Sequence, residues 1–225
     1  MATKNVNNKP ESNQAVGEAV SGVELFLKKH GNLLSTILLV VLIIACGIVA
    51  LNRWVIKPAQ IEARAAAAGA EHYFQLAQYE QALNGDGNVL GLADVIDQYG
   101  AKAGKGVYFE AGVSQLQLKN YDEALKYLKK YNGRDNILKA RAKACMGDAY
   151  VGLENNEAAL AAYKAAIKAA DNDFTPAYIL KAALAAEMLG NKEEALAFYN
   201  DIKVKYPAST QAAEVDKYIS RLNAQ

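Results

Sequence analysis

The longest apolar stretch of the chain covers residues 33–51, and no charged residue interrupts residues 31–52. An α-helix rises about 1.5 Å per residue, so a segment of this length would reach across a hydrocarbon core of about 30 Å. Basic residues stand at both ends of the run, and Trp54 follows it, as suits the headgroup layers of a bilayer. The pattern predicts a transmembrane helix over residues 31–56.

The segment before this span divides into two parts. Residues 1–13 show no apolar period and are rich in Asn, Lys, Pro and Ser, which predicts a disordered tail. Residues 14–30 carry apolar side chains at every third or fourth position, which predicts an amphipathic juxtamembrane helix that lies on the membrane surface or contacts a partner. Gly31 and Asn32 are expected to separate it from the span. A cleaved secretory signal is disfavoured because the apolar run begins far from the N-terminus.

Residues 58–100 carry two helical patterns separated by turn chemistry. Pro58 suits a first helical turn, and residues 59–83 are rich in strong helix formers, so one long helix is expected there. Residues 84–88, NGDGN, form a dense turn signal, and the residues up to Gly100 predict a second helix with its C-terminal stop. The pattern therefore predicts a helical hairpin.

Residues 105–207 repeat themselves. The segments YDEAL, EAALAAY and KEEALAFY align so that Ala124, Ala159 and Ala195 lie 35 and 36 residues apart, and a small residue stands 12 positions before each alanine. Those small residues are Gly112, Gly147 and Ala183. Two antiparallel helices approach closely only where both present little side chain. The six residues therefore predict the closest crossing inside each of three stacked hairpins.

The boundaries of these hairpins carry their own signals. Asn120 precedes Glu123 by three residues, as Asn191 precedes Glu194, and this spacing predicts a capping box at the start of each second helix. In residues 208–225, apolar side chains recur with helical spacing. That stripe predicts a final helix that covers the open end of the array.

The repeated residues resemble the tetratricopeptide repeat (TPR) pattern, W-x2-L-G-x2-Y, A-x3-F, P, over residues 105–207. The second copy fits best, with Gly147, Tyr150, Ala159 and Tyr163, and the third supplies Pro207. The resemblance implies an all-α chain in which a single N-terminal transmembrane helix precedes an α-solenoid of antiparallel hairpins. In such arrays the first helix of each repeat lines a concave groove.

Carrying the groove positions of the family onto this chain predicts a largely apolar partner-binding surface. Its candidate residues are Phe109, Val113, Leu116, Arg141, Asp148, Leu180, Leu184 and Glu187. The alternative is that the apolar positions pack inside the protein or are covered by its own last helix. TPR receptors for acidic chaperone tails resemble each other in a basic clamp that begins with a Lys and an Asn. In this chain the two positions hold Phe109 and Val113, which cannot pair with an acidic tail. That ligand is therefore disfavoured for this groove.

Composition and motifs exclude several function classes. Residues 57–225 hold 20 basic and 21 acidic residues, so no electrostatic footprint for nucleic acid is expected. The chain has two cysteines, Cys46 in the span and Cys145, which predict no disulfide and no Cys-rich metal site. Residues 100–106 lack the Ser or Thr of a phosphate loop, and residues 171–182 lack the Gly and Glu of a calcium loop. We expect no enzyme, no cofactor, no metal and no small-molecule substrate.

The order of tail, span, long helix and repeat array is similar to that of bacterial inner-membrane TPR proteins, of which the YfgM-type ancillary subunits of the Sec translocon are described functionally. The resemblance implies a scaffold for protein partners, such as the translocon or a periplasmic chaperone, anchored in the lipid bilayer through residues 31–56 with a periplasmic C-terminal domain. Charge does not decide the orientation, because basic residues flank both ends of the span. The alternatives are a cytosol-facing receptor for protein import or complex assembly, or an unrecognised enzyme.

Overall fold

The computed structural model describes the backbone of residues 12–224 and the side chains of residues 28–224. All regular elements in this part of the chain are helical, which confirms the predicted all-α class. The chain divides into two compact units, Met1–Lys57 and Pro58–Gln225. The predicted disordered tail falls largely on residues outside the described range, and its last two positions, Ser12 and Asn13, already belong to a helix.

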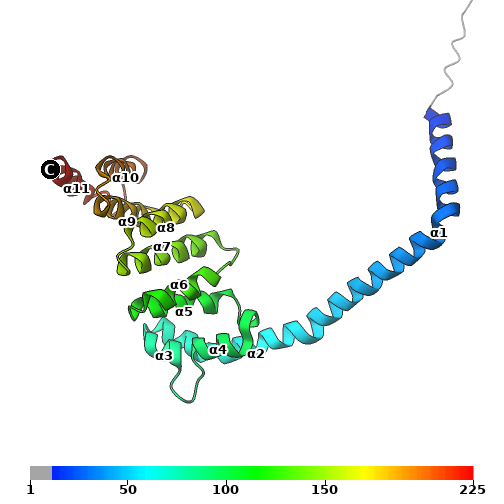
Figure 1. Ribbon diagram of the computed structural model, residues 1–225, viewed down its shortest axis with the longest axis horizontal. Helices are drawn as coiled ribbons and strands as arrows, with labels where there is room; N and C mark the ends of the chain where they lie inside the picture. The colour runs from blue at the N-terminus through cyan, green and yellow to red at the C-terminus, as the bar shows by residue number, and fades with distance from the viewer. Residues whose placement is uncertain (1–11, 225) are drawn as a thin grey trace, which may run out of the picture. The chain divides into compact units, whose positions relative to one another are not determined.

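The first unit is built on helix α1 (Ser12–Leu51), which the π-helix η1 (Asn52–Ile56) follows (Figure 1). By length and composition, the helical segment Lys28–Gln75 contains a window that could cross a membrane, and none of that window is buried inside the structure. Leu33 and Ile43, for example, are 61% and 63% exposed. So much apolar surface is costly in water, whereas a bilayer accommodates it.

The predicted break at Gly31 and Asn32 is wrong, because α1 continues through both residues. The hydroxyls of Ser35 and Thr36 donate to the Asn32 carbonyl at 2.9 and 2.8 Å, as Ser and Thr commonly do inside helices. A single glycine costs a helix only about 1 kcal/mol, which the strong helix formers around it offset. Most side chains of the predicted amphipathic helix lie outside the described residues.

The second unit begins with α2 (Lys57–Gln75), α3 (Tyr79–Asn84) and α4 (Leu92–Tyr99). The prediction of one helix over residues 59–83 is wrong. The chain turns at Ala77, whose φ is 57°, and the Gln78 N–H donates to the Tyr73 carbonyl at 2.9 Å. This is a Schellman ending, in which a residue of positive φ closes the last helical turn.

The same ending closes the first helix of every later hairpin, so α2 and α3 share a local pattern with the later repeats. The residues of positive φ are Ala77, Lys119, Glu154 and Gly190. After the first of them the chain reads YEQAL, which matches the later YDEAL, and Ala70 and Ala82 are fully buried at the equivalent 12-residue spacing. A loop that contains Gly85 and Gly87 then separates α3 from α4.

Three complete hairpins follow a short 3-10 turn, η2 (Gly100–Ala103). They are α5 (Lys105–Gln117) with α6 (Tyr121–Lys130), α7 (Asn136–Gly152) with α8 (Asn156–Ala169), and α9 (Thr175–Met188) with α10 (Lys192–Lys205). The last helix is α11 (Val215–Asn223). Figure 1 shows these hairpins stacked in chain order, as expected for a helical solenoid.

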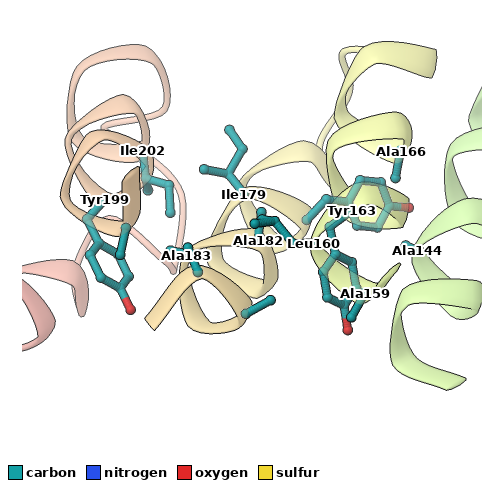
Figure 2. Close-up of a cluster of buried hydrophobic side chains, with 14 of the residues drawn as sticks. Ala144, Ala159, Leu160, Tyr163, Ala166, Ile179, Ala182, Ala183, Tyr199 and Ile202 are labelled. Carbon is teal, nitrogen blue, oxygen red and sulfur yellow. The ribbon is translucent and has the colours of Figure 1, made fainter. Parts of the chain in front are cut away.

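The six small residues with 12-residue spacing are all buried. A Cβ atom added at Gly112 would lie 2.7 Å from Cγ of Leu128, and one added at Gly147 would overlap the Tyr163 ring. Close helix approach therefore excludes even a methyl group at these two positions. Figure 2 shows large side chains such as Tyr163 and Tyr199 filling the space around the small residues of the C-terminal core.

The predicted capping boxes do not form. Asn120 donates its side-chain amide to Oε1 of Gln115 at 2.8 Å, and neither Asn120 nor Asn191 caps its helix with a side-chain oxygen. The carboxylates of Glu123 and Glu194 pair instead with lysines. Side-chain caps occur at α7 and α8, where Asp135 and Asn155 accept backbone N–H groups.

Helix α11 packs through the predicted apolar stripe. Val215 and Leu222 are buried, and Ile219 is half-buried against the C-terminal core. The Tyr218 ring stacks on that of Tyr199, with centroids 5.3 Å apart and an interplanar angle of 6°. The helix thus covers apolar side chains of the last complete hairpin.

Candidate functional site

The candidate groove residues of the first complete repeat differ in accessibility. Phe109 and Val113 are each only 7% exposed and pack in a core cluster with Leu125 and Leu128. The Phe109 ring centroid lies 5.6 Å from that of Tyr131. These two residues therefore pack within the protein, which is the alternative that the sequence left open, and they do not offer their side chains to a partner.

The accessible candidates lie further along the inner helices α5, α7 and α9. Leu116, Leu180 and Leu184 are half-buried, and Arg141 is exposed and forms no ion pair among residues 28–224. Half-buried leucines are suited to contact a partner, because part of each side chain is already fixed by packing and part remains in water. Three apolar candidates and one cation without an ion pair among the described residues are thus accessible.

Asp148 is not free to bind a partner. Both of its carboxylate oxygens accept from Nζ of Lys181 at 2.7 Å, and Oδ1 also accepts from the Tyr163 hydroxyl at 2.8 Å. Burial and the neighbouring Asp148 raise the pKa of Tyr163, so the phenol stays protonated and keeps donating. The network joins α7, α8 and α9 and therefore fixes the second repeat against the third.

Glu187 repeats this arrangement one repeat later. Its carboxylate accepts from the Tyr199 hydroxyl and pairs with the guanidinium of Arg221, which belongs to α11. Burial, followed by the hydrogen bond to Glu187, raises the pKa of Tyr199. Helix α11 thus provides at the end of the array the cation that the next repeat would otherwise supply.

Sequence reasoning missed the partners Lys181 and Arg221. A signal was present, since each basic residue follows its carboxylate by 33 or 34 residues, close to one repeat length. A search for opposite charges one period apart would have found both pairs.

Glu110, on α5, is a half-buried carboxylate without such a partner. Its Oε2 atom has no hydrogen bond among the described residues. Burial, and to a lesser degree the negative charge of Glu71 on α2, raises the pKa of Glu110 from 4.5 to about 7. The Cys145 thiol stays protonated, and therefore unreactive, near neutral pH, because burial raises its pKa to about 11.

Residues 28–224 contain no group of three or more His, Cys, Asp and Glu side chains that could hold a metal ion. A cavity of about 590 Å³ lies where the loop at residues 171–173 meets the loop after α10. The Tyr206 hydroxyl bridges the two loops by donating to Asp171 at 2.7 Å. The arrangement joins loops and does not gather catalytic groups.

Family comparisons agree with this architecture. Residues 106–136 and 140–173 match one model of the tetratricopeptide repeat, and residues 177–209 match another. A comparison with curated proteins gave no match. The matched segments coincide with the three complete hairpins, so the chain carries three tetratricopeptide repeats, which indicate a protein-interaction scaffold.

Proposed function

We propose that this protein is a membrane-anchored adaptor whose repeats bind a segment of a protein partner along the inner helices. The observation that carries the proposal is the set of half-buried leucines at groove positions, Leu116, Leu180 and Leu184, beside the unpaired Arg141. A groove of this kind suits an apolar helix or extended segment that carries a carboxylate for Arg141. Phe109 and Val113 belong to the core cluster against which Leu116 packs.

The anchor is formed by α1 and η1, whose exposed apolar side chains over residues 31–56 would contact the lipid bilayer. We further propose that the repeats face the periplasm of a bacterial inner membrane, near protein translocation or envelope assembly. The support is the resemblance in architecture, together with the rule that long domains are translocated largely regardless of flanking charge. A translocon subunit or a periplasmic chaperone would then be the partner.

A site-specific crosslinking experiment tests the binding surface. A photoreactive amino acid replaces Leu184 in the full-length chain, and the matched control replaces Lys168, an exposed residue of α8. Irradiation of native membranes should give a discrete adduct from position 184 and none from position 168. Equal labelling at both positions would contradict the proposal.

The identity of the adduct and a topology reporter test the location. A reporter that is active only in the exported compartment, fused to the C-terminus, should be active, and the adduct should contain an envelope or translocon protein. Activity of a cytoplasm-only reporter, with adducts to cytosolic proteins, would instead support the cytosol-facing receptor.

A further inference from the structure

A second surface, formed by α6 and α7, carries many basic side chains. Residues 124–147 contain seven basic residues and one acidic residue, while the rest of residues 57–225 holds 13 basic and 20 acidic residues. The basic residues are Lys126, Lys129, Lys130, Arg134, Lys139, Arg141 and Lys143. The near-neutral charge of the whole unit therefore conceals a concentrated positive segment on α6 and α7.

Part of this segment lines a cavity of about 310 Å³ between α6, α7 and α8. Lys129, Lys139 and Lys143 contribute its basic side chains, and Met146, Ala162 and Ala165 are among its apolar ones. None of its lining residues is acidic. The cavity thus combines an apolar wall with three ammonium groups.

The cavity lies away from the proposed groove. Lys139, Lys143 and Met146 recur at intervals of four and three residues, so they share one face of α7. At about 100° per residue, Asp148 of the inner surface lies on the other side of this helix. A ligand in the cavity would therefore leave the groove face of α7 free.

The charges of the cavity are not balanced within the described part of the chain. Lys139 and Lys143 are four residues apart on one helix, a like-charge spacing that is unfavourable. Asp135, the one acidic residue of the segment, accepts the N–H groups of Ile137 and Leu138 at 2.7 and 3.0 Å as the cap of α7. Lys129 lies 5.8 Å from the Tyr150 ring centroid and Lys143 has no ion-pair partner. An external anion would relieve this repulsion.

We propose that this cavity binds an acidic amphipathic helix of a protein partner, at a surface separate from the inner groove. Carboxylates of the helix would pair with Lys129, Lys139 and Lys143, and one of its apolar side chains would enter between Met146 and Ala165. An anionic bilayer could also attract lysines, but a flat surface does not require a recessed apolar wall. The combination of recess and charge therefore favours the helix.

The test uses the full-length chain in phosphatidylcholine nanodiscs. The probe is a fluorescein-labelled helical peptide with leucines on one face and glutamates on the other, and fluorescence anisotropy reports its binding. The control peptides carry lysine in place of every glutamate, or alanine in place of every leucine. The acidic amphipathic peptide should bind, and both control peptides should bind at least about tenfold more weakly.

Two kinds of variant distinguish the contribution of the lysine charges to peptide binding from that of the cavity. The double variant Lys139→Glu with Lys143→Glu should raise the Kd at least about tenfold, and the matched control, Lys119→Glu with Lys192→Glu, should change it less than about twofold. Ala165→Phe fills the cavity without changing charge and should raise the Kd at least about fivefold. Circular dichroism checks that each variant folds, and Ala162→Met replaces Ala165→Phe if that variant does not.

Three results would overturn the proposal. The first is a Kd that none of the cavity variants changes. The second is a loss of affinity in the lysine variant with full affinity in the filled variant, since this would show diffuse attraction. The third is lysine-dependent capture of phosphatidylglycerol vesicles by the nanodiscs without peptide binding, which would assign the surface to the membrane.

Discussion

The two ends of the repeat array treat half-buried carboxylates differently. Toward the C-terminus, Asp148 is held by Lys181 and Tyr163, and Glu187 by Arg221 and Tyr199. Toward the N-terminus, Glu110 has an oxygen without a partner and is near the like charge of Glu71. The same stacking of hairpins therefore gives a charge-balanced interface at one end and an interface with an unpaired carboxylate at the other.

The largest expected effect on stability comes from overpacking a helix crossing in the second repeat, where the carboxylates are paired. Ala159→Leu adds carbon atoms at a fully buried helix crossing and should reduce the free energy of unfolding by about 1 to 3 kcal/mol. The matched control is Ala161→Leu, an exposed position on the same helix, α8. Thermal unfolding of the full-length chain, followed by circular dichroism, measures both. Equal melting temperatures for the two variants would show that the alignment of the repeats is wrong.

The next largest effect is a pH dependence of stability that arises from Glu110, at the N-terminal end of the repeat array. The pKa of Glu110 is raised from 4.5 to about 7 in the folded protein, so the folded state binds more protons than the unfolded state between these values. Stability should therefore fall as the pH rises from about 4.5 to about 7, by about 1 to 2 kcal/mol once solvent screening is allowed for.

Glu110→Gln should remove this pH dependence and stabilise the protein at pH 8. Glu71→Gln should have a smaller effect, because burial is a larger cause of the shift than the neighbouring charge. Glu157→Gln, at an exposed position, is the control. Unfolding curves at pH 5 and pH 8 provide the measurement, and a pH dependence that survives Glu110→Gln would show that another group titrates.

A smaller effect is expected from breaking the balanced network. Asp148→Asn removes the ion pair with Lys181 but leaves an oxygen for the Tyr163 hydroxyl, so the loss should be about 0.5 to 1.5 kcal/mol. Asp201→Asn breaks an exposed pair with Lys205 on one helix and should have little effect. Equal losses in urea unfolding would indicate that the inter-repeat network adds nothing beyond a surface ion pair.

The sequence predicted those features that depend on local pattern. The 12-residue pairs of small residues located the helix crossings, because close approach demands small side chains wherever hairpins repeat. The first hairpin was misjudged because Ala77 adopts positive φ without being glycine, which leaves no compositional sign of a turn. The matching YEQAL segment would have shown it.

The binding surface was less predictable than the fold. Phe109 and Leu180 occupy equivalent family positions, but Phe109 packs against Tyr131 in the core while Leu180 stays half-exposed. Accessibility depends on neighbours in other helices, which the local pattern does not show. The missing cap at Asn120 has a local cause instead, because its amide bonds Gln115 five residues earlier. The cavity between α6, α7 and α8 likewise emerges only when three helices are assembled.

The most direct test of the adaptor function compares Leu184→Ser with Phe109→Ser in full-length chains that carry a photoreactive amino acid at position 180. Leu184→Ser should lower the yield of the partner adduct several-fold, in line with an anchor worth about 1 kcal/mol or more, and leave the melting temperature nearly unchanged. Phe109→Ser should lower the melting temperature, because it removes a core ring. An unchanged adduct yield together with a clear loss of stability in Leu184→Ser would show that Leu184 is a core residue and that the partner binds elsewhere.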